Sequence, residues 1–375
     1  MLLTAETVLT GRELLRPGWI GVSGTTVTDV GAGPPPRRAD RDLGAATVVP
    51  GFVDTHVHGG GGSEFSAADS AATRAAVDLH HRHGTTTVVA SLVSAAPAEL
   101  LQQVVVLAGQ VHDGTIAGIH LEGPWLAAGR CGAHDPALLR DPDDELDRVL
   151  AAGDGTIRMV TLAPERAGAL TAIERIVAAG AVAAVGHTDA SYEQTRAAIE
   201  AGATVGTHLF NAMRPIHHRE PGPVIALLED SRVTVELITD GVHVDGALYR
   251  HVVRSAGPDR VTLITDAMAA AGMADGAYRI GRLEVTVAGG IATLTGTSTI
   301  AGSTATMDRV FRFAVEHSGL PRDRALQEAV AATSVNPARA LGLPVPELEA
   351  GARADLVVLD TNLGVSGVML AGAWL

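Results

Sequence analysis

The sequence predicts an α/β fold, a (β/α)8 TIM-type barrel with a small β-sandwich domain formed by both chain ends. Apolar runs of strand length alternate with Ala-rich helical segments through the middle of the 375 residues, and this alternation is typical of a parallel sheet. Eight such runs occur, and eight strands close a barrel of this type. An open doubly wound sheet is the alternative, but no G-x-G-x-x-G motif follows the first run.

The expected barrel elements follow one another in chain order. The apolar runs lie near residues 48–57, 85–91, 116–122, 157–163, 181–187, 203–208, 232–239 and 261–266. Helical patterns occupy 67–84, 169–180 and 191–202. Gly84, Gly180 and Gly202 come at the ends of these patterns, where glycine commonly terminates a helix.

The two ends of the chain differ from the middle. Both are rich in β-branched residues and glycine turns, which predicts short antiparallel strands. We expect residues 1–48 and 348–375 to form one small β-domain and residues 49–347 to form the barrel. The segment "RLEVTVAGGIATLTG" predicts a β-hairpin insertion near 278–298, before the final helices.

The composition excludes several classes of protein. A net charge of -14 disfavours nucleic acid as a partner, because a phosphate backbone requires a basic surface. No apolar stretch approaches membrane-spanning length, and no signal peptide is evident. Cys131 is the single cysteine, so we expect no internal disulfide and a cytoplasmic location. All 28 basic residues are arginine, which excludes lysine Schiff-base chemistry and a carbamylated-lysine metal bridge.

Polar residues close the apolar runs. They are His56, His58, Glu122, His187, His208 and Asp266. The active sites of TIM-type barrels lie at the carboxyl ends of the strands, so we expect these side chains to meet. A single barrel histidine more often packs or donates a hydrogen bond than binds a metal. Chance, however, seldom places six such residues at the ends of separate strands.

The pair His56 and His58 predicts a divalent metal site. Side chains at i and i+2 of a strand point to the same side, so both imidazoles are expected to face the barrel axis. Imidazoles and carboxylates bind Zn²⁺, Fe²⁺ or similar ions, and Glu122 is expected either as a ligand or as a bridge between two ions. Asp266 is expected to be the base that takes a proton from water, although an N-cap is the structural alternative. His80, His81, His83, His112, His251 and His317 are expected at helix surfaces or ends.

Several segments together resemble a known family. "PGFVDTHVHG", "HLEGPW", "CGAHDP", "GHTDA", "GTHLFNAM" and "TDAM" are similar to motifs of the amidohydrolase superfamily, and within it to the N-acetylglucosamine-6-phosphate deacetylases. The first motif alone indicates only the superfamily. "HLEGP", "CGAH" and "THLFNAM" followed by "REPG" are more specific. The resemblance covers nearly the whole chain, including the flanking β-domain.

The resemblance implies roles for individual residues. It implies that Glu122, His187 and His208 bind the main metal, that His56 and His58 bind a second one, and that Asp266 is the general base and acid. It further implies sugar or acetamide contacts from His134 and His243. Contacts to the 6-phosphate are implied for Asn211, the backbone of Ala212 and Arg219, in a homodimer where Arg219 could serve the neighbouring subunit's site.

Two local features bear on these implied roles. The segment "FNAMRPIHHREPG" gathers Arg214, His217, His218 and Arg219 in an acidic protein, and an arginine fork suits phosphate. A solvated loop with ordinary surface arginines is the alternative. Cys131 stands where the family commonly has lysine before "GAH", so both a role in access to the site and a neutral substitution stay open.

The expected activity is metal-dependent hydrolysis of the acetamide of N-acetyl-D-glucosamine 6-phosphate to D-glucosamine 6-phosphate and acetate. One or two divalent ions per subunit, Zn or Fe, are expected as cofactors. The alternatives are another amidohydrolase, such as a deaminase or a deacetylase of a different acylated amine or amino sugar, and a non-catalytic scaffold on the same barrel. A scaffold is disfavoured because such relatives usually lose ligands, whereas all six positions here keep competent side chains.

Overall fold

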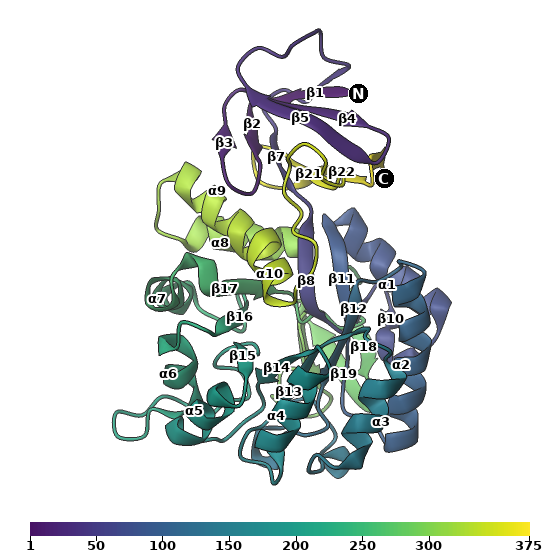
Figure 1. The fold of residues 1–375 in the computed structure, drawn as a ribbon, viewed down its shortest axis with the longest axis vertical. Helices are drawn as coiled ribbons and strands as arrows, with labels where there is room; N and C mark the ends of the chain where they lie inside the picture. The colour runs from purple at the N-terminus through teal and green to yellow at the C-terminus, as the bar shows by residue number, and fades with distance from the viewer.

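An eight-stranded parallel sheet forms the centre of the molecule (Figure 1). The computed structural model describes residues 1–375. Each strand pairs with the next one along the chain, from β8 to β17. The strands are β8 (Phe52–Val57), β11 (Thr85–Leu92), β12 (Gly118–Glu122), β13 (Ile157–Leu162), β14 (Val182–Val185), β15 (Ala203–Gly206), β16 (Thr234–Ile238) and β17 (Val261–Ile264). All eight coincide with apolar runs of the sequence, and the predicted (β/α)8 barrel is confirmed.

The first and last strands meet at a seam that is held by a few specific bonds. The backbone N–H of Asp266 donates to the carbonyl oxygen of His56 at 2.9 Å. The hydroxyl of Thr265 donates to the buried carboxyl group of Asp54 at 2.5 Å. These bonds bring Asp266, which follows the last strand, against His56 near the end of the first.

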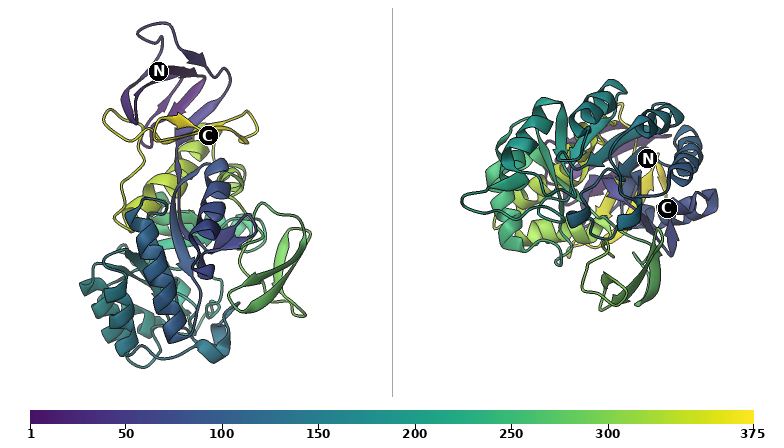
Figure 2. Two further views of the ribbon diagram at one scale, coloured as in Figure 1. Left: turned by 90° about the vertical axis from the view of Figure 1, so that its right-hand side faces the viewer. Right: turned by 90° about the horizontal axis from the view of Figure 1, so that it is seen from below.

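The helices cover the outside of the barrel (Figure 2). They are α1 (Ser70–Arg82), α2 (Pro97–His112), α3 (Asp144–Ala152), α4 (Ala169–Ala178), α5 (Tyr192–Glu200), α6 (Gly222–Glu229), α7 (Gly246–Ala256), α8 (Met307–His317), α9 (Arg322–Val330) and α10 (Asn336–Ala340). Gly84, Gly180 and Gly202 follow the last turns of α1, α4 and α5 with positive φ, as predicted. None of the helices combines the length and apolar character needed to span a bilayer.

His80 was expected at a helix surface or end, and it occupies the last turn of α1. It lies on the inner face of α1, is wholly buried, and donates a hydrogen bond from Nε2 to the carbonyl oxygen of Gly59 at 2.9 Å. Burial lowers the pKa of His80 to about 4, because the charged imidazolium would lose its hydration.

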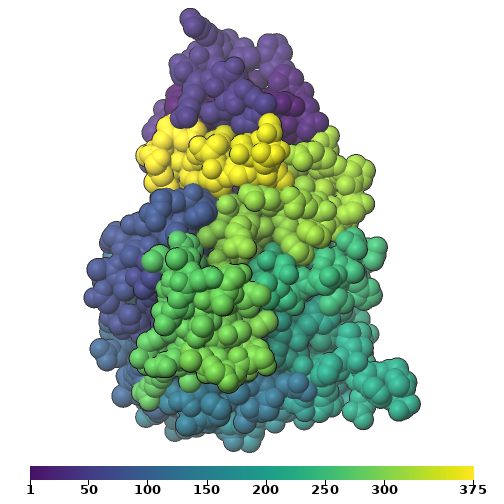
Figure 3. Space-filling view, turned by 180° about the vertical axis from the view of Figure 1, so that it is seen from behind, coloured from purple at the N-terminus to yellow at the C-terminus, as the bar shows by residue number.

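Segments from both ends of the chain share one sheet. That six-stranded sheet has the order β23 (Ala373–Trp374), β22 (Val365–Leu370), β21 (Leu356–Leu359), β7 (Thr47–Pro50), β2 (Thr7–Leu9) and β3 (Leu14–Leu15). A four-stranded sheet packs against it, with the order β5 (Thr26–Ala32), β4 (Gly18–Ser23), β1 (Leu2–Ala5) and β6 (Arg41–Asp42). Ile20 and Val27 of the second sheet share a buried cluster with Val48 and Leu356 of the first. Figure 3 shows the yellow C-terminal strands between the purple N-terminal strands and the barrel. The domain limits stay a prediction.

The insertion after β17 is larger than the expected hairpin. It is a three-stranded antiparallel sheet of β18 (Gly276–Ile280), β19 (Leu283–Ala288) and β20 (Ile291–Leu294). Ile280, Val285 and Ala292 bury one face of it against Val93 and Met268. This apolar face explains the additional strand. The insertion stands at the side of the barrel (Figure 2), beside the short pair β9 (Gly59–Gly60) and β10 (Ser63–Glu64).

Candidate active site

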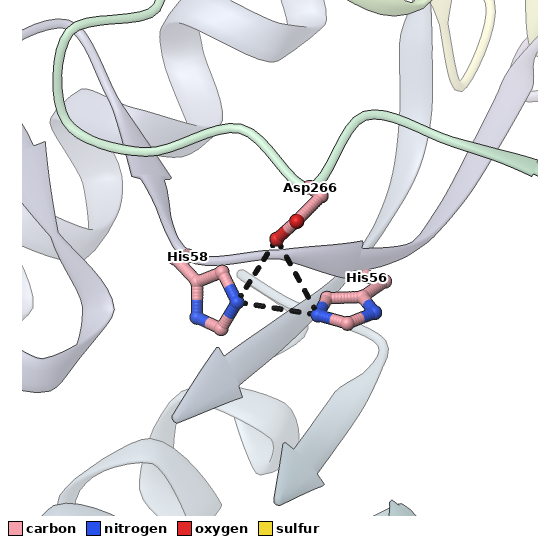
Figure 4. Close-up of side chains that lie close together, drawn as sticks. All are labelled: His56, His58 and Asp266. Carbon is pink, nitrogen blue, oxygen red and sulfur yellow. Dashed lines mark hydrogen bonds and ion pairs between the residues drawn. The ribbon is translucent and has the colours of Figure 1, made fainter. Parts of the chain in front are cut away.

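His56 and His58 lie at the end of β8 with their rings directed to the same place. Their Nε2 atoms are 3.2 Å apart, as the i, i+2 spacing predicted. Oδ1 of Asp266 lies 3.5 Å from Nε2 of His56 and 3.2 Å from Nε2 of His58 (Figure 4). The three side chains therefore form one cluster across the seam of the barrel.

Glu122, His187 and His208 form a second cluster beside the first. Oε1 of Glu122 lies 3.0 Å from Nε2 of His187 and 2.9 Å from Nε2 of His208, and the two imidazole nitrogens are 3.1 Å apart. Oε2 of Glu122 also lies 3.0 Å from Nε2 of His58. Glu122 thus joins both clusters, and the six residues of the two clusters all lie at or directly after the ends of barrel strands.

Three of these residues have an unfavourable backbone conformation. His187, His208 and Asp266 follow β14, β15 and β17 with φ values of 48°, 28° and 48°. Residues other than glycine seldom occupy this left-handed region, and those that do gather at functional sites. The turn after each strand is therefore held in a strained form that directs a polar side chain into the barrel mouth.

The donor atoms fit a divalent cation. Nδ1–H of His187 donates to the carbonyl oxygen of Arg130 at 2.9 Å, so the neutral ring presents the lone pair of Nε2 to Glu122. A lone pair facing a carboxylate oxygen at 3.0 Å needs a cation or a proton between the two atoms. Imidazole nitrogen and carboxylate oxygen are the ligands that Zn²⁺ and Fe²⁺ accept.

The carboxylates dominate the electrostatics of the site. Burial disfavours a protonated His58, but Asp266 and Glu122 outweigh this and raise the pKa of His58 to about 9. Burial also opposes ionisation of Glu122, yet His56 and His187 hold the pKa of that carboxyl well below its usual range. The site therefore favours positive charge among its carboxylates, which a metal ion would also supply.

His134 has a defined tautomer. The backbone N–H of Ser94 donates to Nδ1 of His134 at 3.2 Å, so the proton of the neutral ring is on Nε2. Burial lowers the pKa of His134 to about 4, which keeps the ring neutral. Its Nε2–H group lies 3.3 Å from Oε2 of Glu122 and can donate a hydrogen bond at the centre of the site.

A cavity of about 400 Å³ opens above these side chains. Nine of the eleven residues expected from the sequence line it: His58, Glu122, His134, His187, His208, Asn211, Ala212, His243 and Asp266. His56 is buried beneath them. His243 is oriented by Asp240, whose carboxylate accepts from Nδ1 at 2.8 Å. The cavity is large enough for a monosaccharide derivative.

Arg219 is not among the residues that line the cavity of its own chain. It lies on an exposed loop before α6, where Nη1 is 2.7 Å from Nε2 of His218. Arg214 of the same loop is held by the carboxylate of Asp189 at 3.1 Å. The same carboxylate accepts from Nε of Arg130 at 2.9 Å, and Arg130 does line the cavity. Cys131, the next residue, is half-buried.

The sequence contained further site residues that were not singled out. Glu236 is a buried carboxylate within β16, with Oε2 3.5 Å from Nδ1 of His56 and Oε1 accepting from the hydroxyl of Thr55 at 3.1 Å. A carboxylate inside the apolar run "VTVELIT" was a usable signal. Residues 298–300 of the insertion also line the cavity, and no pattern in the sequence pointed to them.

The nearly closed parallel barrel, with imidazoles and carboxylates gathered at its strand ends, is typical of barrel hydrolases. The chain belongs to the Amidohydrolase family, which matches residues 47–375. Enzymes of this superfamily typically depend on a metal, and the two clusters of this chain are candidate sites for one.

Individual members of this family are similar to the chain over most of its length. The chain is 67% identical to an N-acetyl-D-glucosamine-6-phosphate deacetylase of Mycobacterium smegmatis, with a TM-score of 0.99 over 100% of this chain and 98% of that one. The structure of that relative is of an aspartate-to-alanine variant in complex with N-acetyl-D-glucosamine-6-phosphate. An N-acetylglucosamine-6-phosphate deacetylase of Bos taurus is 36% identical over 88% of this chain and 84% of that protein. An N-acetylgalactosamine-6-phosphate deacetylase of Escherichia coli O157:H7 is 36% identical over 97% of this chain and 98% of that protein.

Proposed function

We propose that this chain hydrolyses the acetamide of N-acetyl-D-glucosamine 6-phosphate, releasing D-glucosamine 6-phosphate and acetate in amino-sugar catabolism or recycling. The observation that carries the proposal is the convergence of Glu122, His187 and His208 on one point beside Asp266. The likeness to the Mycobacterium smegmatis enzyme, at 67% identity over the whole chain, supports the choice of substrate.

We assign the main metal position to Glu122, His187 and His208, and a second one to His56 and His58. One or two divalent ions per subunit, Zn or Fe, would be bound there. A divalent ion at this place supplies Lewis-acid chemistry, which polarises an amide carbonyl and makes water a stronger acid. The protein's own side chains carry out the proton transfers and hold the substrate.

Asp266 is the proton carrier of the proposed reaction. Its Oδ1 atom lies within 3.5 Å of both imidazoles at the end of β8, so it borders the point where water must attack. It accepts the proton of the attacking water and later gives that proton to the departing amine. The water oxygen becomes part of acetate, and the amine leaves on the sugar.

His134 and His243 hold the acetamide and the sugar. The Nε2–H group of His134 is directed at the centre of the site and donates to the oxyanion of the tetrahedral intermediate. His243, fixed by Asp240, donates to a sugar oxygen. Asn211 and the backbone of Ala212, both on the cavity wall, receive the 6-phosphate.

Arg219 completes the phosphate site in this proposal. Its exposed loop projects from the barrel, and it does not line the cavity of its own chain. This arrangement favours a homodimer in which Arg219 serves the neighbouring subunit. An arginine fork is the group that best matches a phosphate.

N-acetylgalactosamine 6-phosphate is the second candidate substrate, because a relative that this chain matches over 98% of that relative's length is named for it. Parallel steady-state assays with N-acetylglucosamine 6-phosphate and N-acetylgalactosamine 6-phosphate decide between them. A higher kcat/KM for the first compound supports the proposal, and a higher value for the second assigns the epimer. If the protein hydrolyses neither compound, the proposed function is wrong and a different amidohydrolase activity is indicated.

A further inference from the structure

A second large cavity lies at the opposite end of the barrel strands from the candidate active site. It encloses about 530 Å³. Its walls come from the beginnings of β11 and β13, from the loop at 343–346, from the segment 352–355 before β21, and from the end of β22, where the barrel meets the small β-domain (Figure 1). It shares no lining residue with the active-site cavity.

Arg158 is the unusual residue of this cavity. It is half-buried on β13, and its Nε–H group is buried with no acceptor in the protein. No carboxylate pairs with its guanidinium, in contrast to Arg353 on the same wall, which contacts Asp355 at 3.0 Å. The terminal nitrogen atoms of Arg158 make no hydrogen bond or ion pair in the protein and are not among the buried atoms, so they have unused capacity for an anion.

A glycine on the neighbouring strand β12 provides the space for the side chain of Arg158. A Cβ atom at Gly118 would overlap Cγ of Arg158, so the stem of the side chain lies directly against the backbone of β12. Thr86, on the neighbouring strand β11, also lines the cavity and carries a buried hydroxyl group without a hydrogen-bond partner. Nε of Arg158 and the hydroxyl oxygen of Thr86 are both inaccessible from the cavity, so its occupant can contact Arg158 only through the terminal Nη groups.

The charges and the shape of the cavity define what it can hold. Asp355 is its only carboxylate, and that group is already engaged by Arg353 and by the N–H of Ala371. The fixed charge that remains is positive. The rest of the wall is mixed, with polar His81, Thr87 and Thr115 and an apolar part formed by Val111, Ile116, Leu343, Pro344, Val345 and Pro346.

We propose that this cavity is a binding site for a small molecule with one carboxylate or phosphate group on an apolar body. The terminal Nη groups of Arg158 hold the anionic oxygens. The apolar body lies against Ile116, Leu343 and Val345. The site joins the barrel to the sheet of the chain ends, and it is separate from the site of hydrolysis.

Isothermal titration of the full-length, metal-loaded protein tests this site. The probes are hexanoate, phenyl phosphate and, as an uncharged control, hexanol. We expect at least one anionic probe to bind with a Kd of about 1 mM or lower. Arg158→Met should weaken that binding about tenfold or more, since it removes the charge and keeps the volume. Hexanol should bind no variant measurably.

Two further variants control the experiment. Arg148→Met removes an exposed arginine of α3 and should leave the affinity unchanged. Arg158→Lys keeps the charge but removes the planar fork and should weaken binding of the anion about two- to tenfold, which tests the site again if Arg158→Met fails to fold. Equal binding by Arg158→Met and the unmodified protein would overturn the proposal, as would the absence of binding by both anions. A crystal structure showing the probe only in the active-site cavity would also overturn it.

Discussion

Nε2 of His208 lies 2.9 Å from Oε1 of Glu122, although 86 residues separate them in the chain. The contact joins the ends of β12 and β15, and Nε2 of His187 reaches the same oxygen at 3.0 Å. One carboxylate oxygen therefore organises two imidazoles from two other strands. Its removal should affect metal binding more than any other single change.

Glu122→Gln should release the metal. The amide keeps one oxygen but loses the charge that offsets the cation, so we expect the metal content per subunit to fall below about half after dialysis, with turnover lower by about 10²-fold or more. Elemental analysis and a rate assay measure both quantities. Glu145→Gln, a buried carboxylate of α3 paired with Arg140, should keep its metal. Full metal content in Glu122→Gln would refute the assigned ligand set.

Asp266→Asn should separate metal binding from catalysis. The amide cannot take a proton, whereas the cluster of Glu122, His187 and His208 is untouched, so we expect at least one ion to remain and kcat to fall by about 10²- to 10⁴-fold. Steady-state kinetics on protein of measured metal content checks this. The exposed Asp259 on the outer surface provides the control, since Asp259→Asn should be fully active. A normal rate in Asp266→Asn would exclude it as the base.

Arg219→Ala should affect only phosphorylated substrates. Loss of the arginine fork should raise KM for N-acetylglucosamine 6-phosphate by about tenfold or more, and should leave any hydrolysis of N-acetylglucosamine unchanged. Parallel assays with the two sugars measure the difference. Arg148→Ala, which removes an exposed arginine of α3, is the matched control. Equal losses with both sugars would show that Arg219 acts on the fold and not on the phosphate.

His80 should make the stability of the protein depend on pH. Its pKa is lowered from 6.5 to about 4 by burial, so between these values the unfolded chain binds more protons than the folded one. The free energy of unfolding should therefore fall by about 3 kcal/mol from this residue as the pH decreases from 6.5 to 4, and no such loss is expected above pH 6.5. His81, His83 and Asp308 are the titratable groups that act on it.

Denaturant unfolding of the His80→Gln variant at several pH values measures this contribution. Glutamine keeps a donor for the carbonyl oxygen of Gly59 and does not titrate. The difference in stability between the unmodified protein and the variant should shrink toward pH 4. His112→Gln, at the exposed end of α2, should follow the unmodified protein. Parallel pH profiles for His80→Gln and the unmodified protein would contradict the buried, neutral imidazole.

Most of the barrel could be predicted because its strands are buried on both faces. Continuous apolar runs ending in His56, Glu122 or Asp266 gave both the strand positions and the edge where polar side chains meet. The sequence placed His80 at a helix surface or end but did not predict its burial. The pattern "DLHHRHG" looks exposed, and only the packing of α1 against β9 shows that one of its imidazoles faces inward.

Other parts of the site depend on packing that leaves no local signal. Residues 298–300 reach the cavity because the insertion folds back on the barrel mouth through Ile280 and Val285. Glu236 lies 3.5 Å from His56 across the barrel interior, although the two residues are far apart in the chain. The tautomer of His134 depends on a backbone N–H group of Ser94, whose position only the fold determines.

Release of acetate from N-acetylglucosamine 6-phosphate, measured with and without a divalent ion, tests the proposed function most directly. Protein stripped by a chelator should be inactive, and addition of Zn²⁺ or Fe²⁺ should restore the formation of acetate and glucosamine 6-phosphate in equal amounts. Failure of every divalent ion to produce acetate from this sugar phosphate would contradict the assigned activity.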